Sequence, residues 1–404
     1  MSRAKRWTKL RHKIATDLVR PFFGRVAKRK YHATVDKFDG EGDRNWLILA
    51  NHQTDFDQFF VGMAFRRPVY YVAMEDVFSK GFVSRLIEWL VAPIPILKAT
   101  TDLKSIKTCI RVAREGGTIA LFPEGNRTYS GKTCYIKPGV ASLAKKLGLP
   151  IAIFRIEGGY GVKPRWADTP RNGTMHAGVT RVIEPTEYEA LSKEELYALI
   201  CGELQVDESA GEAVYASDRA AEGLERVLYV CPRCGVAEFT AAGDTVTCKS
   251  CGLAARYTEH CRLEPLSGTL PFATVAEWYD YQEAFIRGFD LAPYTDTPLF
   301  TDTVRLDEVI VFKKKKPLEA EAVVQAFADR FEITGKTVRL TLPFDGIKAA
   351  ACVDDHKLNV FFGDTIYQLQ NSGGFNALKY CNVYYHAKFI KGGGEDGEFQ
   401  FLGL

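Results

Sequence analysis

Short apolar runs alternate with amphipathic segments from about residue 43 to residue 183. The apolar runs are rich in β-branched residues, and we expect strands at 46–51, 69–74, 94–97, 118–125, 150–158 and 179–185. Between these runs, apolar positions recur at helical spacing over 57–65, 82–91, 104–115 and 139–148. The alternation predicts an α/β domain with a mixed sheet and flanking helices.

The second half of the chain has a different pattern. Residues 193–226 are acidic and alanine-rich, which is typical of a helix followed by a linker, and 274–289 have helical spacing. Further on, we expect strands at 307–314, 337–344, 347–353, 358–363 and 365–370, and a helix at 375–389. This order predicts a small β-rich α+β domain, and it resembles the element order of a pleckstrin-homology-type barrel.

The first thirty residues are strongly basic. They contain eleven Lys or Arg and one acid, Asp17, although the net charge of the whole chain is only +3. Their apolar positions recur at three- and four-residue steps along one side of a helix, at Trp7, Leu10, Ile14, Leu18 and Phe22. Such a stripe either lies in a membrane interface or packs on the protein's own core, and periodicity fits both. Pro21 is expected to bend this segment or to begin a second short helix.

No apolar stretch has the length of a transmembrane helix, because the most apolar one, 89–99, is interrupted by Pro93 and Pro95. The basic start also lacks the apolar region and cleavage site of a secretory signal. Four of the ten cysteines stand in a metal-like pattern, and the other six show no spacing typical of a disulfide framework. We therefore expect a cytoplasmic protein that is attached peripherally to the cytosolic face of a membrane.

A histidine follows the first expected strand, and an aspartate follows it five positions later, at His52 and Asp57. The spacing alone is weak, since His12 and Asp17 repeat it inside an expected helix, where five residues separate two side chains by about 140°. His52, by contrast, ends a strand and Asp57 begins a helix, so the two side chains can face each other. Thr54 and Asp57 also have the spacing of a capping box, which would give Asp57 a purely structural role.

A second polar turn follows another expected strand, in the sequence LFPEGNRTYSG at 121–131. The guanidinium of Arg127 and the backbone amides around Glu124 and Gly125 are suited to bind a phosphate or another anion. Lys137 adds a cation just before an expected helix. The alternative is an ordinary surface turn with solvated charges.

Together these motifs resemble those of the lysophosphatidate acyltransferase family of glycerolipid acyltransferases, H-x-x-x-x-D and F-P-E-G-x-R. Residues 51–57 and 122–131 match them in the expected order, and 92–100 and 146–158 stand where the second and fourth blocks of the family fall. The resemblance covers about residues 30–190 and implies the glycerolipid acyltransferase fold. Two departures are Lys98, which stands where the second block usually has arginine, and the absence of a second proline in the fourth block.

The resemblance implies a mechanism and a substrate. His52 would be the general base on an acceptor hydroxyl, Asp57 would orient it, and the acyl donor would be acyl-CoA or acyl-carrier protein. The residues that would hold the acceptor phosphate are Glu124, Gly125, Arg127, Lys98 and Lys137. The expected reaction converts 1-acyl-glycerol 3-phosphate to phosphatidate at a membrane surface. Alternatives are acylation of glycerol 3-phosphate or another lysophospholipid, and a catalytically silent membrane scaffold.

Two C-x-x-C knuckles are separated by thirteen residues, with thiols at Cys231, Cys234, Cys248 and Cys251. Four thiolates at this spacing predict a structural Zn²⁺ site in a zinc ribbon. The ribbon has few cations and no aromatic platform, so we expect no nucleic acid and instead a structural role or a protein partner at the ribbon or the C-terminal domain.

The lysine run at 313–316 would contact phospholipid or be a solvated loop. The expected domains are basic membrane-association helices (1–30), an acyltransferase domain (31–200), a linker (201–227), the zinc ribbon (228–262) and a β-rich domain (263–404).

Overall fold

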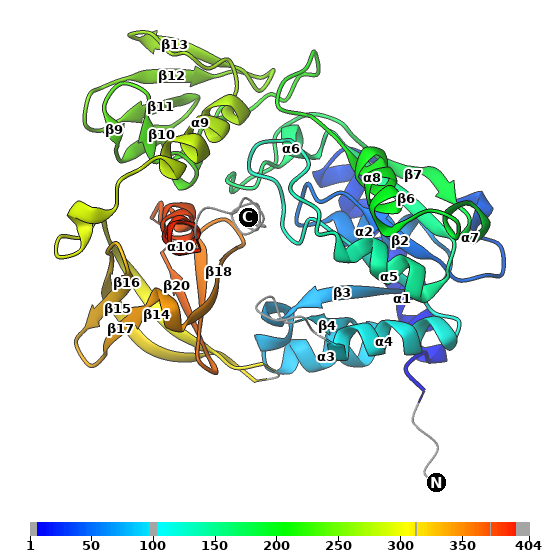
Figure 1. Ribbon diagram of the computed structural model, residues 1–404. Coiled ribbons are helices and arrows are strands. Elements are labelled where there is room, and N and C mark those ends of the chain that lie inside the picture. Colours follow the sequence, from blue (N-terminus) through cyan, green and yellow to red (C-terminus); the bar gives the residue numbers. More distant parts are fainter. Residues whose placement is uncertain (1–5, 97–102, 312, 372, 393–404) are drawn as a thin grey trace.

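The N-terminal half is built on one seven-stranded mixed sheet (Figure 1). The computed structural model describes residues 6–96, 103–311, 313–371 and 373–392. The strand order is β1-β7-β6-β2-β5-β3-β4, and every pairing is parallel except that of β6 with β7. The strands are β1 (Ala33–Val35), β2 (Leu47–Ala50), β3 (Val69–Met74), β4 (Ile94–Ile96), β5 (Thr118–Leu121), β6 (Ile151–Glu157) and β7 (Met175–Ile183).

Helices cover both faces of this sheet. They are α1 (Leu10–Lys30), α2 (Asp57–Ala64), α3 (Phe82–Val91), α4 (Leu103–Arg114), α5 (Gly139–Leu147), α6 (Gly159–Val162), α7 (Pro185–Tyr188) and α8 (Lys193–Leu204). Alternate residues of β2 point to opposite faces, so Ile48 belongs to the same hydrophobic cluster as Phe60 of α2, while Leu49 belongs to another cluster with Ala141 of α5. The mixed α/β architecture expected from the alternating pattern is therefore confirmed.

Helix α1 differs from its prediction in one respect. It runs through Pro21 as a single helix, so this proline does not begin a second one. Four members of the apolar stripe, Leu10, Ile14, Leu18 and Phe22, are exposed. Trp7, by contrast, packs on the protein's own core and donates from Nε1 to Ala92 O at 3.1 Å. The opposite side of α1 buries residues such as Ala27. Among the described helices, none combines the length and the apolar character that crossing a bilayer requires.

The second half contains three further sheets and two long helices. A two-stranded sheet is formed by β8 (Val230–Cys231) and β9 (Gly235–Val236). A four-stranded antiparallel sheet is formed by β10 (Phe239–Ala242), β11 (Thr245–Cys248), β12 (Ala254–Tyr257) and β13 (Leu263–Ser267). Helix α9 (Val275–Arg287) then leads to the β-rich C-terminal unit, which we define as β14 to β20 with helix α10 (Ala377–Lys391).

The β-rich C-terminal unit is an antiparallel sheet in the order β17-β16-β15-β14-β20-β19-β18. Its strands are β14 (Phe300–Val309), β15 (Lys316–Ala326), β16 (Arg330–Gly335), β17 (Arg339–Pro343), β18 (Ile347–Val353), β19 (Lys357–Phe362) and β20 (Thr365–Gln370). Two of these, β15 and β16, were not expected from the sequence. Lys313, Lys314 and Lys315 lie between β14 and β15, and the backbone of Lys314 pairs with that of Lys80.

Helix α10 is capped by a distant part of the chain. Asn376 accepts a hydrogen bond from Lys379 N, and its Nδ2 donates to Glu225 O at 3.1 Å and Leu228 O at 3.2 Å, which lie 151 and 148 residues earlier. One continuous hydrophobic core joins α10, the β-rich sheet and the cysteine-bearing segment. The C-terminal half is thus held together by contacts between residues far apart in sequence.

Candidate active site

His52 and Asp57 meet at the carboxyl end of β2, as their positions predict. His52 Nδ1 lies 2.8 Å from Asp57 Oδ2, which also accepts hydrogen bonds from the amides of Gln53 (2.6 Å) and Thr54 (2.9 Å). Thr54 Oγ1 donates to Asp57 Oδ1 at 2.6 Å, and Asp57 is fully buried. The N-cap residue of α2 is Phe56, without a side-chain cap bond, so the capping box predicted for Thr54 and Asp57 does not form at the helix start. The bonds from Gln53 and Thr54 nevertheless hold the carboxylate of Asp57 against the imidazole, and its catalytic role stays a prediction.

This arrangement leaves the second ring nitrogen of His52 available. A carboxylate that already receives three other donors accepts from Nδ1–H, so Nε2 carries the lone pair that a general base needs. The side chain of His52 is 21% exposed, and its ring stacks on Phe122 with centroids 4.5 Å apart. The imidazole is thus fixed in orientation while keeping access to a substrate.

The similarly spaced pair in α1 does not form. His12 is buried and its Nδ1 lies 3.1 Å from Tyr70 Oη, whereas Asp17 binds Lys13 and Arg20 on the surface. Position at a strand end, and not the spacing, therefore distinguishes the two matches.

Glu124 joins the polar turn to the backbone of His52. Its Oε1 accepts from His52 N at 2.7 Å and its Oε2 from Cys134 N at 2.6 Å, while Thr128 N donates to His52 O at 3.2 Å. Burial raises the pKa of Glu124 to about 8, and the two amide donors act in the opposite direction. Both oxygens of Glu124 face backbone amides, so in this structure the side chain positions His52, and its predicted contact with phosphate stays a prediction.

The other predicted phosphate contacts differ in how they are placed. Gly125 has φ of +73°, a left-handed conformation that glycine adopts readily. Arg127 is half-buried, and within the described ranges its guanidinium makes no hydrogen bond or salt bridge, so it is available to an anion. Lys137 is exposed two residues before α5 begins. Lys98 lies outside the described residues.

Two charged side chains near Arg127 were missed from the sequence. Arg165 is buried and donates from Nη1 to Arg127 O at 2.9 Å. Lys163 is also buried, and its ammonium donates to Ala167 O. Both lie in a segment after α6 that has no motif and no periodicity, so only the three-dimensional arrangement reveals them.

The comparisons with known proteins agree with this site. Residues 26–156 match the model of the acyltransferase family, and this stretch contains His52, Asp57, Glu124 and Arg127. This match over about a third of the chain supports the family that the two motifs indicate.

Two curated relatives are chloroplast 1-acyl-sn-glycerol-3-phosphate acyltransferases. The one from Brassica napus is 23% identical over 142 residues, which is 35% of this chain and 40% of the relative. The one from Arabidopsis thaliana is 23% identical over 138 residues, 34% of this chain and 37% of the relative. The chain thus spans about two fifths of the length of these relatives. The solved structure of the LPA acyltransferase PlsC from Thermotoga maritima aligns with 47% of this chain and 76% of its own, with 23% identity and a TM-score of 0.40.

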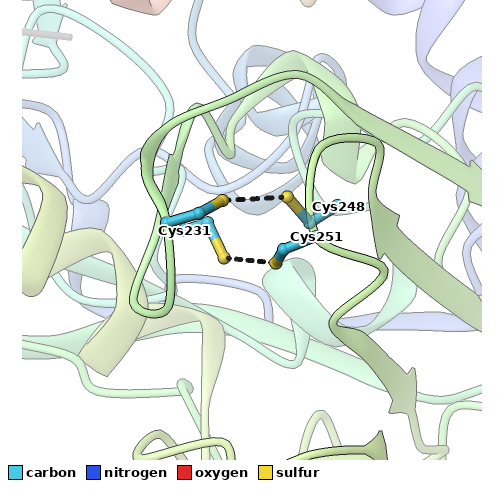
Figure 2. Close-up of side chains that lie close together, drawn as sticks. Cys231, Cys248 and Cys251 are labelled. Atoms are coloured by element: carbon cyan, nitrogen blue, oxygen red, sulfur yellow. Dashed lines mark hydrogen bonds between the residues drawn. The ribbon is translucent and has the colours of Figure 1, made fainter.

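The four predicted metal ligands come together at one end of the second half. The sulfur atoms of Cys231, Cys234, Cys248 and Cys251 all lie within 4.8 Å of one another. The Cys231–Cys251 and Cys234–Cys248 sulfur pairs are each 3.6 Å apart, and Figure 2 shows the labelled sulfurs facing a common centre. Tetrahedral Zn–S bonds of about 2.3 Å require sulfur atoms about 3.8 Å apart, so these residues fit a zinc ion.

Proposed function

We propose that this protein transfers an acyl group from a thioester to the hydroxyl of 1-acyl-glycerol 3-phosphate, giving phosphatidate. The observation that carries the proposal is the oriented imidazole of His52 near the guanidinium of Arg127, on loops that share direct hydrogen bonds. Among the described residues, this guanidinium makes no hydrogen bond or salt bridge. The family match and the curated relatives support the same activity.

The chemistry follows from the geometry of His52. Nε2 takes the proton of the acceptor hydroxyl, whose oxygen attacks the thioester carbonyl carbon. The carbon–sulfur bond breaks, an ester forms, and the proton passes from the imidazolium to the departing thiolate. The buried carboxylate of Asp57 stabilises the imidazolium in between. Arg127 binds the acceptor phosphate, with Gly125 and Lys137 beside it.

An acyl-transfer assay with purified protein tests this proposal. Lysophosphatidate, glycerol 3-phosphate and lysophosphatidylcholine should each be offered with acyl-CoA and with acyl-carrier protein. We expect lysophosphatidate to be acylated fastest. Arg127 favours its exposed phosphate monoester, and the acyl chain of lysophosphatidate adds apolar binding. Faster acylation of glycerol 3-phosphate would change the assigned acceptor. If none is acylated, the enzyme proposal fails and a silent scaffold is the better description.

We further propose peripheral binding to the cytosolic face of a membrane, through a surface formed by α1 and α3. On α3, Phe82, Val83, Leu86 and Trp89 are exposed, and Phe82 is 78% accessible. Helix α1 packs beside α3, where Arg11 donates to Trp89 O at 2.8 Å and lies over its ring. Exposed apolar side chains next to the cations of α1 are suited to an anionic bilayer surface.

Replacing Phe82 and Trp89 together by alanine should weaken binding to phosphatidylserine-containing vesicles about tenfold or more, because both side chains would lose apolar burial in the lipid. Co-sedimentation at two salt concentrations measures this. Leu266→Ala is the matched control, since Leu266 is 56% exposed but lies on β13. Equal binding by the double variant and wild type would contradict the docking surface.

A further inference from the structure

The turn between β18 and β19 lies against the loop that carries Arg127. Arg165, only 1% exposed, donates from Nη1 to Arg127 O at 2.9 Å, from Nε to Asp354 O at 2.9 Å and from Nη2 to Cys352 O at 3.2 Å. One guanidinium therefore ties the acyltransferase loop to the β-rich C-terminal unit.

Neighbouring contacts reinforce this tie. Asn126, next to Arg127, donates from Nδ2 to Cys352 O at 3.3 Å. The guanidinium of Arg165 lies 4.0 Å from the ring centroid of Tyr129, which follows in the same loop. A separate backbone pairing joins Lys80 to Lys314. The loop over residues 126–129 thus has the C-terminal unit as one of its supports.

The turn itself is held from a second direction. Arg226, which precedes β8, donates from Nη1 to Asp355 Oδ2 at 3.0 Å and to Asp168 Oδ1 at 2.7 Å. The guanidinium of Arg226 thus bridges the carboxylate of Asp355 and that of Asp168, which lies in the acyltransferase half. This bridge fixes Asp355 relative to that half. A turn fixed in this way is a rigid support for the loop it contacts.

The chemistry of Arg165 makes it hard to replace. Its hydrogen bonds go to three backbone carbonyls, so a planar group with several donors in fixed directions is needed. A lysine at this position would keep the positive charge, but a single ammonium cannot reach three carbonyls in one plane and stack on Tyr129 at once. The geometry therefore requires arginine specifically.

We infer that Arg165 and the β18–β19 turn are positioning elements of the acceptor site, so that the β-rich C-terminal unit fixes the guanidinium of Arg127 for an anionic acceptor. This inference rests on the proposed function for the role of Arg127. It adds that acceptor affinity depends on a part of the chain outside the family-matched residues 26–156. Arg165 acts through Arg127 and does not itself touch the reacting atoms.

The variant Arg165→Lys tests the inference against the matched control Arg171→Lys. Arg171 is also buried, donates to a backbone carbonyl, Ala220 O, and lies 4.7 Å from the ring centroid of Tyr257, but it has no hydrogen bond to the loop of Arg127. Arg165→Lys should raise KM for lysophosphatidate about tenfold with kcat changed less than threefold. Arg171→Lys should leave KM within twofold, whatever it does to Tm.

A double-variant cycle separates positioning from general loosening. Arg127→Ala removes the contact between the guanidinium and the acceptor phosphate. Adding Arg165→Lys to this variant should therefore raise KM no further. An additive rise in KM, or a parallel loss of kcat and Tm in both lysine variants, would overturn the inference.

Hydrogen exchange makes the test independent of activity. The amides of 124–129 should exchange faster in Arg165→Lys and not in Arg171→Lys. If wild type acylates no acceptor, the proposed function fails, and the exchange result still decides whether Arg165 fixes this loop. Unchanged exchange in Arg165→Lys would refute the positioning role.

Discussion

Replacing His52 by alanine should lower kcat for acyl transfer by about 10²- to 10⁴-fold, the usual contribution of a positioned general base. The reason is the loss of the imidazole that Asp57 orients at this strand end. The fold should survive, because the bonds that hold Asp57 to Gln53 and Thr54 and Glu124 to the backbone of residue 52 do not use the imidazole. Steady-state kinetics with circular dichroism as a check on folding measures the effect.

The chain offers a matched control for this variant. His176 on β7 also pairs with an aspartate, Asp36, at 2.8 Å, but both side chains are more than half exposed and lie outside the site. His176→Ala should keep kcat within about twofold, as expected for a surface pair that contributes little. A folded His52→Ala protein with full turnover would reject the base mechanism even if acyl transfer itself were established.

We expect the cysteine cluster to hold zinc, and removal of that zinc should unfold the segment that contains the cluster. We expect about one Zn²⁺ per chain, with a contribution to folding on the order of 10 kcal/mol. Cys231 and Cys248 belong to the same hydrophobic core as Trp278 of α9, so the loss should extend beyond the two knuckles. Elemental analysis gives the zinc content, and thermal unfolding before and after chelation gives the loss of stability.

Serine substitutions distinguish the effect of losing the metal from the effect of losing a thiol. Cys234→Ser removes one of four ligands and should release zinc and lower Tm strongly. Cys201→Ser changes a half-buried thiol on α8 that is not in the cluster, and it should leave zinc content unchanged. Absence of zinc after gentle purification, or equal Tm for both serine variants, would count against a structural zinc site.

The elements that were predicted well are those whose apolar runs end sharply. Strands β3, β18 and β20 have the expected bounds because Gly, Pro or polar turn residues close each run. Strand β15 was missed because residues 316–326 contain two glutamates and several alanines, which favour a helix or a loop when taken alone. Its pairing with β14 and β16 supplies the stability that its composition does not indicate.

The same distinction holds for the candidate site. His52, Asp57, Glu124 and Arg127 stand in short motifs at strand ends, so local sequence was enough to single them out as candidates. Arg165 contacts Cys352 and Asp354, which are 187 and 189 residues away, and no local pattern encodes such a pair. The role of Glu124 was also set by tertiary contacts, because only the fold shows that its oxygens face backbone amides.

The cap of α10 has a consequence for biosynthesis. Asn376 binds the backbone carbonyls of Glu225 and Leu228, which are translated about 150 residues earlier. Helix α10 can therefore dock on this segment only after the residues between them have been translated. Until then, the surface that later covers Tyr380 and Tyr384 is open in the nascent chain. The β-rich C-terminal unit therefore cannot complete its folding before α10 has been translated, and a chaperone that binds apolar segments would act during that interval.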